Sequence, residues 1–391
     1  MPQGLSNTLY ACGQLGISPP TDWLQQYWHA SASKLGEFKP QELSNTLYAC
    51  AQLGITPPAD WLQWFWHASA SKLGTFNEQS LSNTLQACGQ LDVLPPADWL
   101  GRYWKASALE LNKSTALGLS NTLIACAELG ATPPADWLQR YWRVSSSKMG
   151  ELMSRKLSTM LVTLAQLDIT PPAGWLQSFS DSFKRSIPDS NLRCLNDAAL
   201  ALAALELWEL PLWPVLWEHI CQSLPRDAAG WDEEAHFHAR RFYRVYRAAA
   251  VERPGLLSAP DQELLAAARK SWTDHAHLRQ DAGRSRIYAD IAACLTRMGV
   301  AHTHHRWCNR TECTVNVAIE GATPVAVEVR LPHHLLKDGR PTGFTLLRSR
   351  MLAAHGWRVL TVDFHVWEEL MHHKTGPQRE DYLRRMLVRR V

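Results

Sequence analysis

The chain has 391 residues, of which 46% are hydrophobic and 20% charged, a composition typical of folded globular proteins that excludes a largely disordered chain. The formal net charge is only +3, so a nucleic-acid-binding surface would need lysine and arginine side chains gathered locally. The sequence contains no apolar run long enough for a membrane-spanning helix, and we expect no membrane partner.

The beginning of the chain and its cysteines bear on its compartment. Four of the nine cysteines occupy equivalent positions of a repeated sequence, Cys12, Cys50, Cys88 and Cys126. Each falls on the apolar stripe of a predicted helix, which favours reduced core residues of an intracellular protein. The first residues, MPQGLSNTL, run straight into a repeat without a signal or transit segment. Because arrays normally begin with a polar capping unit, we expect the natural protein to start upstream, with its targeting segment absent from this chain.

One sequence returns at a fixed step. LSNTLYACAQLGITPPADWLQ, which starts at Leu43, recurs almost unchanged, and its leucine and tryptophan positions share a 38-residue period. The positions are Leu5, Leu43, Leu81, Leu119 and Leu157, and Trp23, Trp61, Trp99, Trp137 and Trp175. The same step reaches Leu195 and Trp213 in a degenerate sixth unit. A fixed period of roughly 20 to 50 residues indicates a solenoid.

Each unit is predicted to be a pair of helices. In the second unit, Leu43 and Leu47 follow helical spacing and Gly54 suits a helix C-terminus. Thr56 and the two prolines after it predict the start of a second helix, which carries Trp61 and ends at Gly74. Such a pair cannot bury its apolar face alone, so we expect an α-solenoid of 38-residue helix-turn-helix repeats, with the tryptophans buried between units.

The 38-residue period and the repeated sequence LSNTLYACAQLGITPPADWL resemble the octotricopeptide repeats of green-algal organelle RNA-binding proteins, over roughly residues 1–215. The resemblance implies binding of single-stranded RNA at about one nucleotide per repeat, as in other helical-repeat RNA readers.

The first helix of each repeat carries candidate RNA contacts opposite its leucine stripe. Asparagine and glutamine can pair with base edges, and tyrosine can stack on a base. The candidates are Asn7, Tyr10, Gln14, Asn45, Tyr48, Gln52, Asn83, Gln86, Gln90, Asn121, Ile124 and Glu128. The middle position varies while its neighbours hardly change, as a base-reading code would require. The alternative is that the asparagines satisfy backbone groups and that the middle position varies because solvent tolerates any residue.

After about Asp227 the period dissolves into AHFHARRFYRVYRAAA, which places Arg240, Arg244 and Arg247 on one helical face. These arginines are candidate phosphate contacts. The favoured alternative is a solvated face of an amphipathic connector helix, covering residues 227–285 between a solenoid of 1–226 and a C-terminal domain of 286–391.

The C-terminal hundred residues change character. CTVNVAIE and TPVAVEVRL predict a β-hairpin, GFTLLRSRMLAAHGW a helix ended by Gly356, RVLTVDF a buried strand, and VWEELMHH and EDYLRRMLVRR two further helices. Together they predict a small α/β domain. The pieces VAVEV, GFTLLRSRMLAAHGWRVLTVDFHVWEEL and DYLRRML resemble the RAP domain, over about 316–387. That resemblance implies a restriction-endonuclease-like fold and a place in organelle RNA metabolism.

The same resemblance raises the question of cleavage. Nucleases of that fold hold a divalent cation between an Asp and a Glu. Here the Asp position is Asn316, and the next inward residue after Glu328 is Arg330, where many RAP domains have an acid, so we expect the carboxylate pair to be broken. Glu320 or Asp338 could substitute, but we expect RNA contact without cleavage, through arginines that include Arg348 and Arg350, and no metal or cofactor.

A second possible metal cluster lies in HTHHRWCNRTEC, which offers His302, His304, His305, Cys308 and Cys313. The spacing matches no zinc finger, so we favour a polar loop ahead of the hairpin.

Three functions remain open. The first is sequence-selective binding of single-stranded organelle RNA by a factor for RNA stability, processing, splicing or translation, with other proteins of a ribonucleoprotein complex as further partners. The second is a metal-dependent endoribonuclease, and the third is a protein–protein scaffold. The resemblance places the protein in the chloroplast first and the mitochondrion second.

Overall fold

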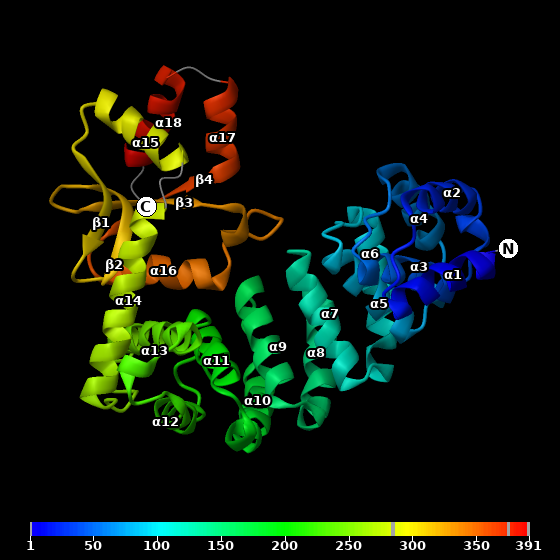
Figure 1. Cartoon of the computed structure of the whole chain (residues 1–391), viewed down its shortest axis with the longest axis horizontal. Helices are drawn as coiled ribbons and strands as arrows, with labels where there is room; N and C mark the ends of the chain where they lie inside the picture. The colour runs from blue at the N-terminus through cyan, green and yellow to red at the C-terminus, as the bar shows by residue number, and fades with distance from the viewer. Residues whose placement is uncertain (1, 283–285, 374–375, 389–391) are drawn as a thin grey trace. The chain divides into compact units, whose positions relative to one another are not determined.

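The computed structural model describes residues 2–282, 286–373 and 376–388. They form two compact units, Met1–Ser186 (unit 1) and Ile187–Val391 (unit 2), each considered separately below (Figure 1). The boundary precedes the sixth repeat, whereas the sequence suggested one near residue 226. Among the described residues, no helix is both long and apolar enough to span a bilayer.

Unit 1 consists of helix pairs that follow the 38-residue period. We call the first member of each pair the A helix and the second the B helix. The A helices are α1 (Pro2–Leu15), α3 (Pro40–Leu53), α5 (Glu78–Gln90), α7 (Ala116–Glu128) and α9 (Ser154–Leu167). The B helices are α2 (Thr21–Ala32), α4 (Ala59–Ala70), α6 (Ala97–Glu110), α8 (Ala135–Lys148) and α10 (Ala173–Ser186). The predicted α-solenoid is therefore confirmed.

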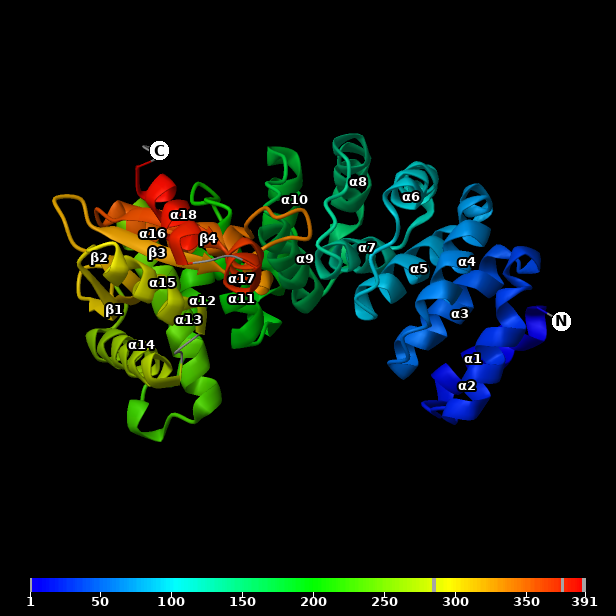
Figure 2. The same ribbon diagram turned by 90° about the horizontal axis from the view of Figure 1, so that it is seen from above.

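The two kinds of helix form two rows. Neighbouring A helices pack closely along their lengths, whereas neighbouring B helices make fewer close approaches (Figures 1 and 2). A row of more tightly spaced helices lies on the inner side of a curved stack, because the outer row must spread. The A helices therefore line the concave side of unit 1.

Local sequence explains where the helices end. Gly54 follows α3 with φ +65°, and the equivalent Asp92 and Asp168 take the same left-handed conformation. The predicted start at Thr56 is wrong, because Pro58 occupies the N-cap position of α4 and no side chain caps it. The predicted end at Gly74 is also wrong: α4 ends at Ala70, and Gly74 lies in a short 3-10 turn.

The tryptophans join successive repeats. Trp61 is 1% exposed, and its indole Nε1 donates to Ser31 Oγ of the preceding pair at 2.9 Å. Stacked and edge-on aromatic rings continue this contact from B helix to B helix. The prediction of burial between units is confirmed for Trp61, Trp99 and Trp137, whereas Trp23 is only half-buried.

Unit 2 begins with the sixth helix pair, α11 (Leu192–Ala204) and α12 (Trp213–Ser223). Two long helices follow, α13 (Glu233–Glu252) and α14 (Gln262–Ala282). The sixth pair is degenerate in its contacts as well as in its sequence. In earlier repeats a serine accepts the hydrogen bond of the following tryptophan, but the equivalent residue here is Phe183. Trp213 Nε1 donates instead to the carbonyl of Leu207 at 2.9 Å.

The C-terminal domain is a four-stranded sheet between helices. Strands β1 (His302–Cys308), β2 (Cys313–Ile319), β3 (Val325–Arg330) and β4 (Arg358–Asp363) lie in that order, antiparallel except for the parallel pair β3–β4. Helices α15 (Arg286–Arg297), α17 (Phe364–His373) and α18 (Gly376–Val388) cover one face, and α16 (Gly343–Ala354) packs on the other. The expected hairpin is confirmed as β2–β3, but the expected polar loop is wrong, since it forms β1.

Candidate nucleic-acid interface

Each A helix presents a continuous stripe of solvent-accessible residues on the face opposite its leucines. In α3 this stripe is Gln41, Asn45, Tyr48 and Gln52, which follow helical spacing. Gln41 and Gln52 are exposed and the other two half-buried, while Leu43 on the opposite face is fully buried. We call these four positions and their equivalents in the other repeats the A-helix stripe.

The stripe recurs in every repeat of unit 1, and none of its members is buried. The members are Gln3, Asn7, Tyr10 and Gln14; Gln79, Asn83, Gln86 and Gln90; Leu117, Asn121, Ile124 and Glu128; and Arg155, Thr159, Val162 and Gln166. The candidates from the sequence therefore lie together. The first position of each set, such as Gln41, was missed, although it lies four residues before the asparagine on the same helical face.

Hydrogen bonds separate the two interpretations of the asparagines. Ser44 Oγ donates to the carbonyl of Ser80 in the next repeat at 3.0 Å, and Thr46 Oγ1 donates to that of Glu42 at 2.7 Å. The neighbours of Asn45 thus satisfy backbone groups, while within the described residues Asn45 and Asn83 make no side-chain hydrogen bond. Their amides remain available to a ligand. Asn121 differs, because Lys156 Nζ donates to its Oδ1 at 3.2 Å.

The outermost position of the stripe is tied between repeats. Gln14 Nε2 donates to Gln52 Oε1 at 3.1 Å. Gly13 permits this approach, since a Cβ there would lie 2.8 Å from Gln52 Oε1. Gly89 likewise leaves room for Glu128, since a Cβ at position 89 would lie 2.6 Å from Glu128 Oε2. Partial burial raises the pKa of the Glu128 carboxyl. These contacts hold the spacing of the stripe from one repeat to the next.

The stripe carries little charge. Residues 1–186 contain 13 acidic and 13 basic side chains, and the stripe of the first three repeats is uncharged. Arg155, in the fifth repeat, is its exposed cation. Affinity for a polyanion here would therefore depend on stacking and hydrogen bonding more than on counterion release.

The arginines of α13 have intramolecular partners. Arg240 pairs with Glu233 at 2.9 Å, and Arg244 Nη2 donates to the carbonyl of Phe344 at 3.3 Å. Arg247 Nη1 donates to the carbonyl of Glu312 at 3.3 Å. Burial lowers the pKa of Arg244 to about 10. The favoured interpretation as a solvated face is therefore wrong for Arg244 and Arg247, which attach α13 to the sheet domain.

Arg350 of α16 has a similar role. Its Nε lies 2.9 Å from Glu252 Oε1, and its Nη2 and Nη1 donate to the carbonyls of Ala203 and Ala204 at 2.9 and 3.3 Å. These carbonyls end α11, so a cation here also meets the negative end of the helix dipole. The sequence suggested RNA contact for Arg350, but the structure commits its guanidinium to the sixth repeat.

Arg348 occupies the position considered for a metal. Its Nε and Nη2 form a bidentate pair with Glu328 at 2.8 and 2.9 Å, and Nη2 also donates to the carbonyl of Thr314. Glu328 is the main cause of a raised pKa for Arg348. Asn316 Nδ2 donates to Tyr288 Oη at 2.7 Å. The one surviving carboxylate is thus neutralised by a guanidinium, and Arg348 is held within the domain.

The histidine- and cysteine-rich segment forms strand β1. His302 and His304 lie with their ring centroids 5.5 Å apart. Within the described part of the chain, no three His, Cys, Asp or Glu side chains come together as metal ligands.

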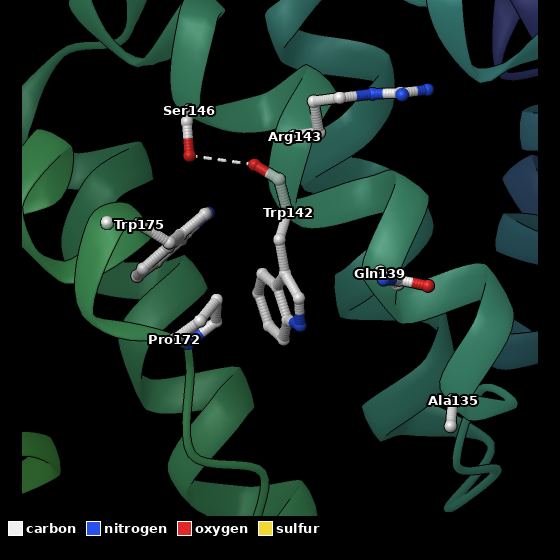
Figure 3. Close-up of a pocket in the computed structure, with 8 residues that line it drawn as sticks. Ala135, Gln139, Trp142, Arg143, Ser146, Pro172 and Trp175 are labelled. Atoms are coloured by element: carbon white, nitrogen blue, oxygen red, sulfur yellow. Dashed lines mark hydrogen bonds between the residues drawn. The ribbon is translucent and has the colours of Figure 1, made fainter.

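A shallow pocket of about 430 Å³ lies on the B-helix side of unit 1, between α8 and α10. Trp142 faces Pro172 and Trp175 there, with Arg143 and Gln139 at the rim (Figure 3). Its lining includes Gly174, which stands where the other repeats have an aspartate. The exchange of aspartate for glycine is visible in the sequence, where PPAGWL stands in place of the PPADWL of the three preceding repeats.

Two family models match parts of the chain. Residues 1–132 match the Tbc2 translation factor, N-terminal domain, and residues 327–386 match the RAP domain. The first match covers an octotricopeptide-like helical region, and the second confirms the predicted RAP domain. Together the matches point to an RNA-binding factor of organelle gene expression.

Proposed function

We propose that the protein binds single-stranded RNA sequence-selectively along the A-helix stripe and acts in a post-transcriptional step of organelle gene expression. The observation that carries the proposal is the accessible row of free carboxamides and tyrosines at a fixed 38-residue spacing, exemplified by Asn45, Tyr48 and Asn83. A constant frame presents equivalent polar groups to successive nucleotides. The variable position, occupied by Tyr10, Tyr48, Gln86, Ile124 and Val162, distinguishes one base from the next.

The chemistry of the stripe favours bases over a protein partner. A peptide groove would offer apolar anchors, whereas the stripe of the first three repeats consists of amides and phenols. The fourth repeat differs, since Leu117 is 50% exposed and Ile124 half-buried. We therefore propose that the fourth repeat contacts RNA more weakly and less selectively than the first three.

We further propose that the C-terminal domain does not cleave RNA. Support comes from Arg348, which saturates Glu328 on both carboxylate oxygens, and from Asn316, whose amide is bound to Tyr288. A nuclease would need that carboxylate free to hold a divalent cation. Metal-dependent cleavage by the purified chain that disappears in Glu328→Ala would reverse this conclusion.

The family matches support a role in organelle gene expression, and within that role we propose a step and a compartment. The N-terminal match is to a translation factor domain, so we propose translation of an organelle messenger RNA as the first step to examine, ahead of stability, processing and splicing. The chloroplast of a green alga is the proposed compartment and the mitochondrion the alternative. Microscopy of a fluorescent fusion of the protein in cells tests this assignment.

Selection from a randomised RNA pool tests the central proposal. We expect wild-type protein to enrich a short motif, and Gln86→Ala to relax the preference at one position of that motif. Gln63→Ala provides the matched control, since Gln63 is an exposed glutamine on the B helix of the second repeat. Selection of the same motif by wild type and Gln86→Ala, or no enrichment by wild type, would contradict a base-reading stripe.

A further inference from the structure

Two free cysteines face each other at the end of the β1–β2 hairpin. Cys308, the last residue of β1, is paired in register with Cys313, the first of β2. Directly opposed residues of antiparallel strands have Cα atoms about 4.5 to 5.5 Å apart. This spacing lies inside the range of about 4.4 to 6.8 Å that a disulfide bridges. The backbone already holds the two residues at disulfide spacing.

The two thiols have different environments. Cys308 is half-buried and reachable, while Cys313 is 9% exposed and donates to Thr311 Oγ1 at 3.1 Å. Burial alone would raise the pKa of Cys308, but hydrogen bonds from Thr311, the Trp357 indole and the Arg310 backbone together lower it. Because the thiolate is the nucleophile in disulfide exchange, Cys308 is the residue that reacts first.

The residue next to Cys313 attaches the sheet to the helices. Glu312 has φ +43°, a left-handed conformation that is strained for a non-glycine residue. Its carboxylate meets Arg269 of α14 at 2.5 Å and Arg247 of α13 at 3.5 Å, and also accepts the Tyr243 hydroxyl. Its carbonyl accepts Trp272 Nε1 at 2.5 Å. The hairpin tip that joins the two cysteines therefore also docks on both long helices.

We propose that Cys308 and Cys313 form a reversible dithiol–disulfide pair whose oxidation loosens the attachment of Glu312 to α13 and α14. The oxidant is a disulfide, either of a small thiol such as glutathione or of a thiol oxidoreductase. The Cys308 thiolate attacks it, forming a mixed disulfide and releasing one thiolate. The Cys313 thiolate then attacks the Cys308 sulfur and releases the second. The cysteines lose two electrons and two protons, and the oxidant is reduced to two thiols.

The loosening follows from the hydrogen bond that the reaction removes. A sulfur in a disulfide has no proton, so Cys313 can no longer donate to Thr311 Oγ1. Thr311 and Cys313 directly flank the strained Glu312, so the loss of this bond acts on the residue that attaches the hairpin to α13 and α14. A carboxylate held by several partners at once tolerates little displacement, because each charge-assisted contact depends on geometry.

Peptide mapping tests the covalent step, because Arg310 lies between the cysteines. Trypsin separates WCNR (307–310) from TECTVNVAIEGATPVAVEVR (311–330) unless a disulfide joins them. We expect the joined peptide after the full chain is incubated with oxidised glutathione, and its loss on reduction. Cys308→Ser and Cys313→Ser should each abolish it, while Cys221→Ser, which removes a half-buried helical thiol, should leave it unchanged. Absence of the joined peptide, or glutathione retained separately on either cysteine, overturns the proposal.

Amide hydrogen exchange tests the structural consequence. Exchange in α13, α14 and the β1–β2 hairpin should become several-fold faster in the oxidised protein. Glu312→Gln should produce the same direction of change in the reduced protein, without any disulfide. A joined peptide together with unchanged exchange in α13 and α14 would overturn the loosening. RNA binding enters neither readout, so these outcomes are independent of the proposed function.

Discussion

Trp99 donates its indole N–H to the hydroxyl of Ser69 in the preceding repeat at 2.9 Å, with both side chains buried. The same bond joins Trp137 to Ser107 and Trp175 to Ser145. In each case the serine that accepts the bond lies thirty residues before the tryptophan. Stacking of repeats is therefore specified by one polar bond inside an aromatic row, in addition to apolar burial.

Ser69→Ala should destabilise unit 1 by about 1–3 kcal/mol, since it leaves a buried indole N–H without an acceptor. Denaturant unfolding followed by tryptophan fluorescence measures the change. Ser71→Ala is the control, because Ser71 is exposed and bonds only within its own helix. Equal stability of the two variants would show that the Trp99–Ser69 bond does not hold the repeats together.

Tyr48→Ala should weaken RNA binding by about 1–3 kcal/mol through loss of one stacked base. Fluorescence anisotropy with the selected RNA gives the affinity. Trp64→Ala is the matched control: Trp64 is an aromatic residue of the same repeat, 60% exposed, but on the B helix. Loss of affinity in Trp64→Ala with wild-type affinity in Tyr48→Ala would place RNA on the opposite surface.

Arg155→Gln should weaken binding to all RNA sequences alike and reduce the salt dependence of affinity by about one phosphate contact. Arg155 is exposed on the A-helix stripe, where a cation can meet the backbone of the bound strand. Titrations at several salt concentrations measure the slope. An unchanged slope would mean that Arg155 contacts no phosphate.

Arg350→Met should act on stability and leave the salt slope of RNA binding unchanged. The substitution leaves Glu252 and the carbonyls of Ala203 and Ala204 without their cation, at a cost of about 2–3 kcal/mol. Thermal unfolding of the full chain measures the loss in unit 2. Arg340→Met is the control, since Arg340 is exposed and pairs with the nearby Asp338. A reduced salt slope in Arg350→Met would instead restore Arg350 as a phosphate contact.

Stability should fall on acidification through His238 of α13. Burial lowers the pKa of His238, so the unfolded chain takes up the proton first as pH falls through about 6.5. The stabilisation is full above that pH and is lost as pH approaches the lower folded-state value. His238→Gln should remove this part of the pH dependence of the unfolding free energy, whereas His67→Gln, at an exposed position, should not. Identical pH profiles for wild type and His238→Gln would contradict this assignment.

The sequence was most informative where structure repeats. The 38-residue period located every helix pair of unit 1 and the stripe containing Asn45 and Tyr48, because helical spacing alone decides which residues share a face. It was less informative at β1, where HTHHRWC contains a single β-branched residue, Thr303, and is stabilised by pairing with β2.

Long-range partners were beyond sequence patterns. Arg350 looked like surface charge, yet its acceptors Ala203 and Ala204 lie about 146 residues away along the chain. Arg244 and Phe344 are 100 residues apart. Counting arginines cannot distinguish a guanidinium that binds phosphate from one that caps a helix, because the two differ only in tertiary partners.

Photocrosslinking is the most direct test of where RNA binds. A short RNA carrying the selected motif and a photoreactive base would be irradiated with the protein, and the attached peptides identified by mass spectrometry. We predict crosslinks at Tyr10 and Tyr48, whose rings lie on the A-helix stripe. Crosslinks confined to B-helix aromatics such as Trp64 or Trp142 would contradict recognition by the stripe.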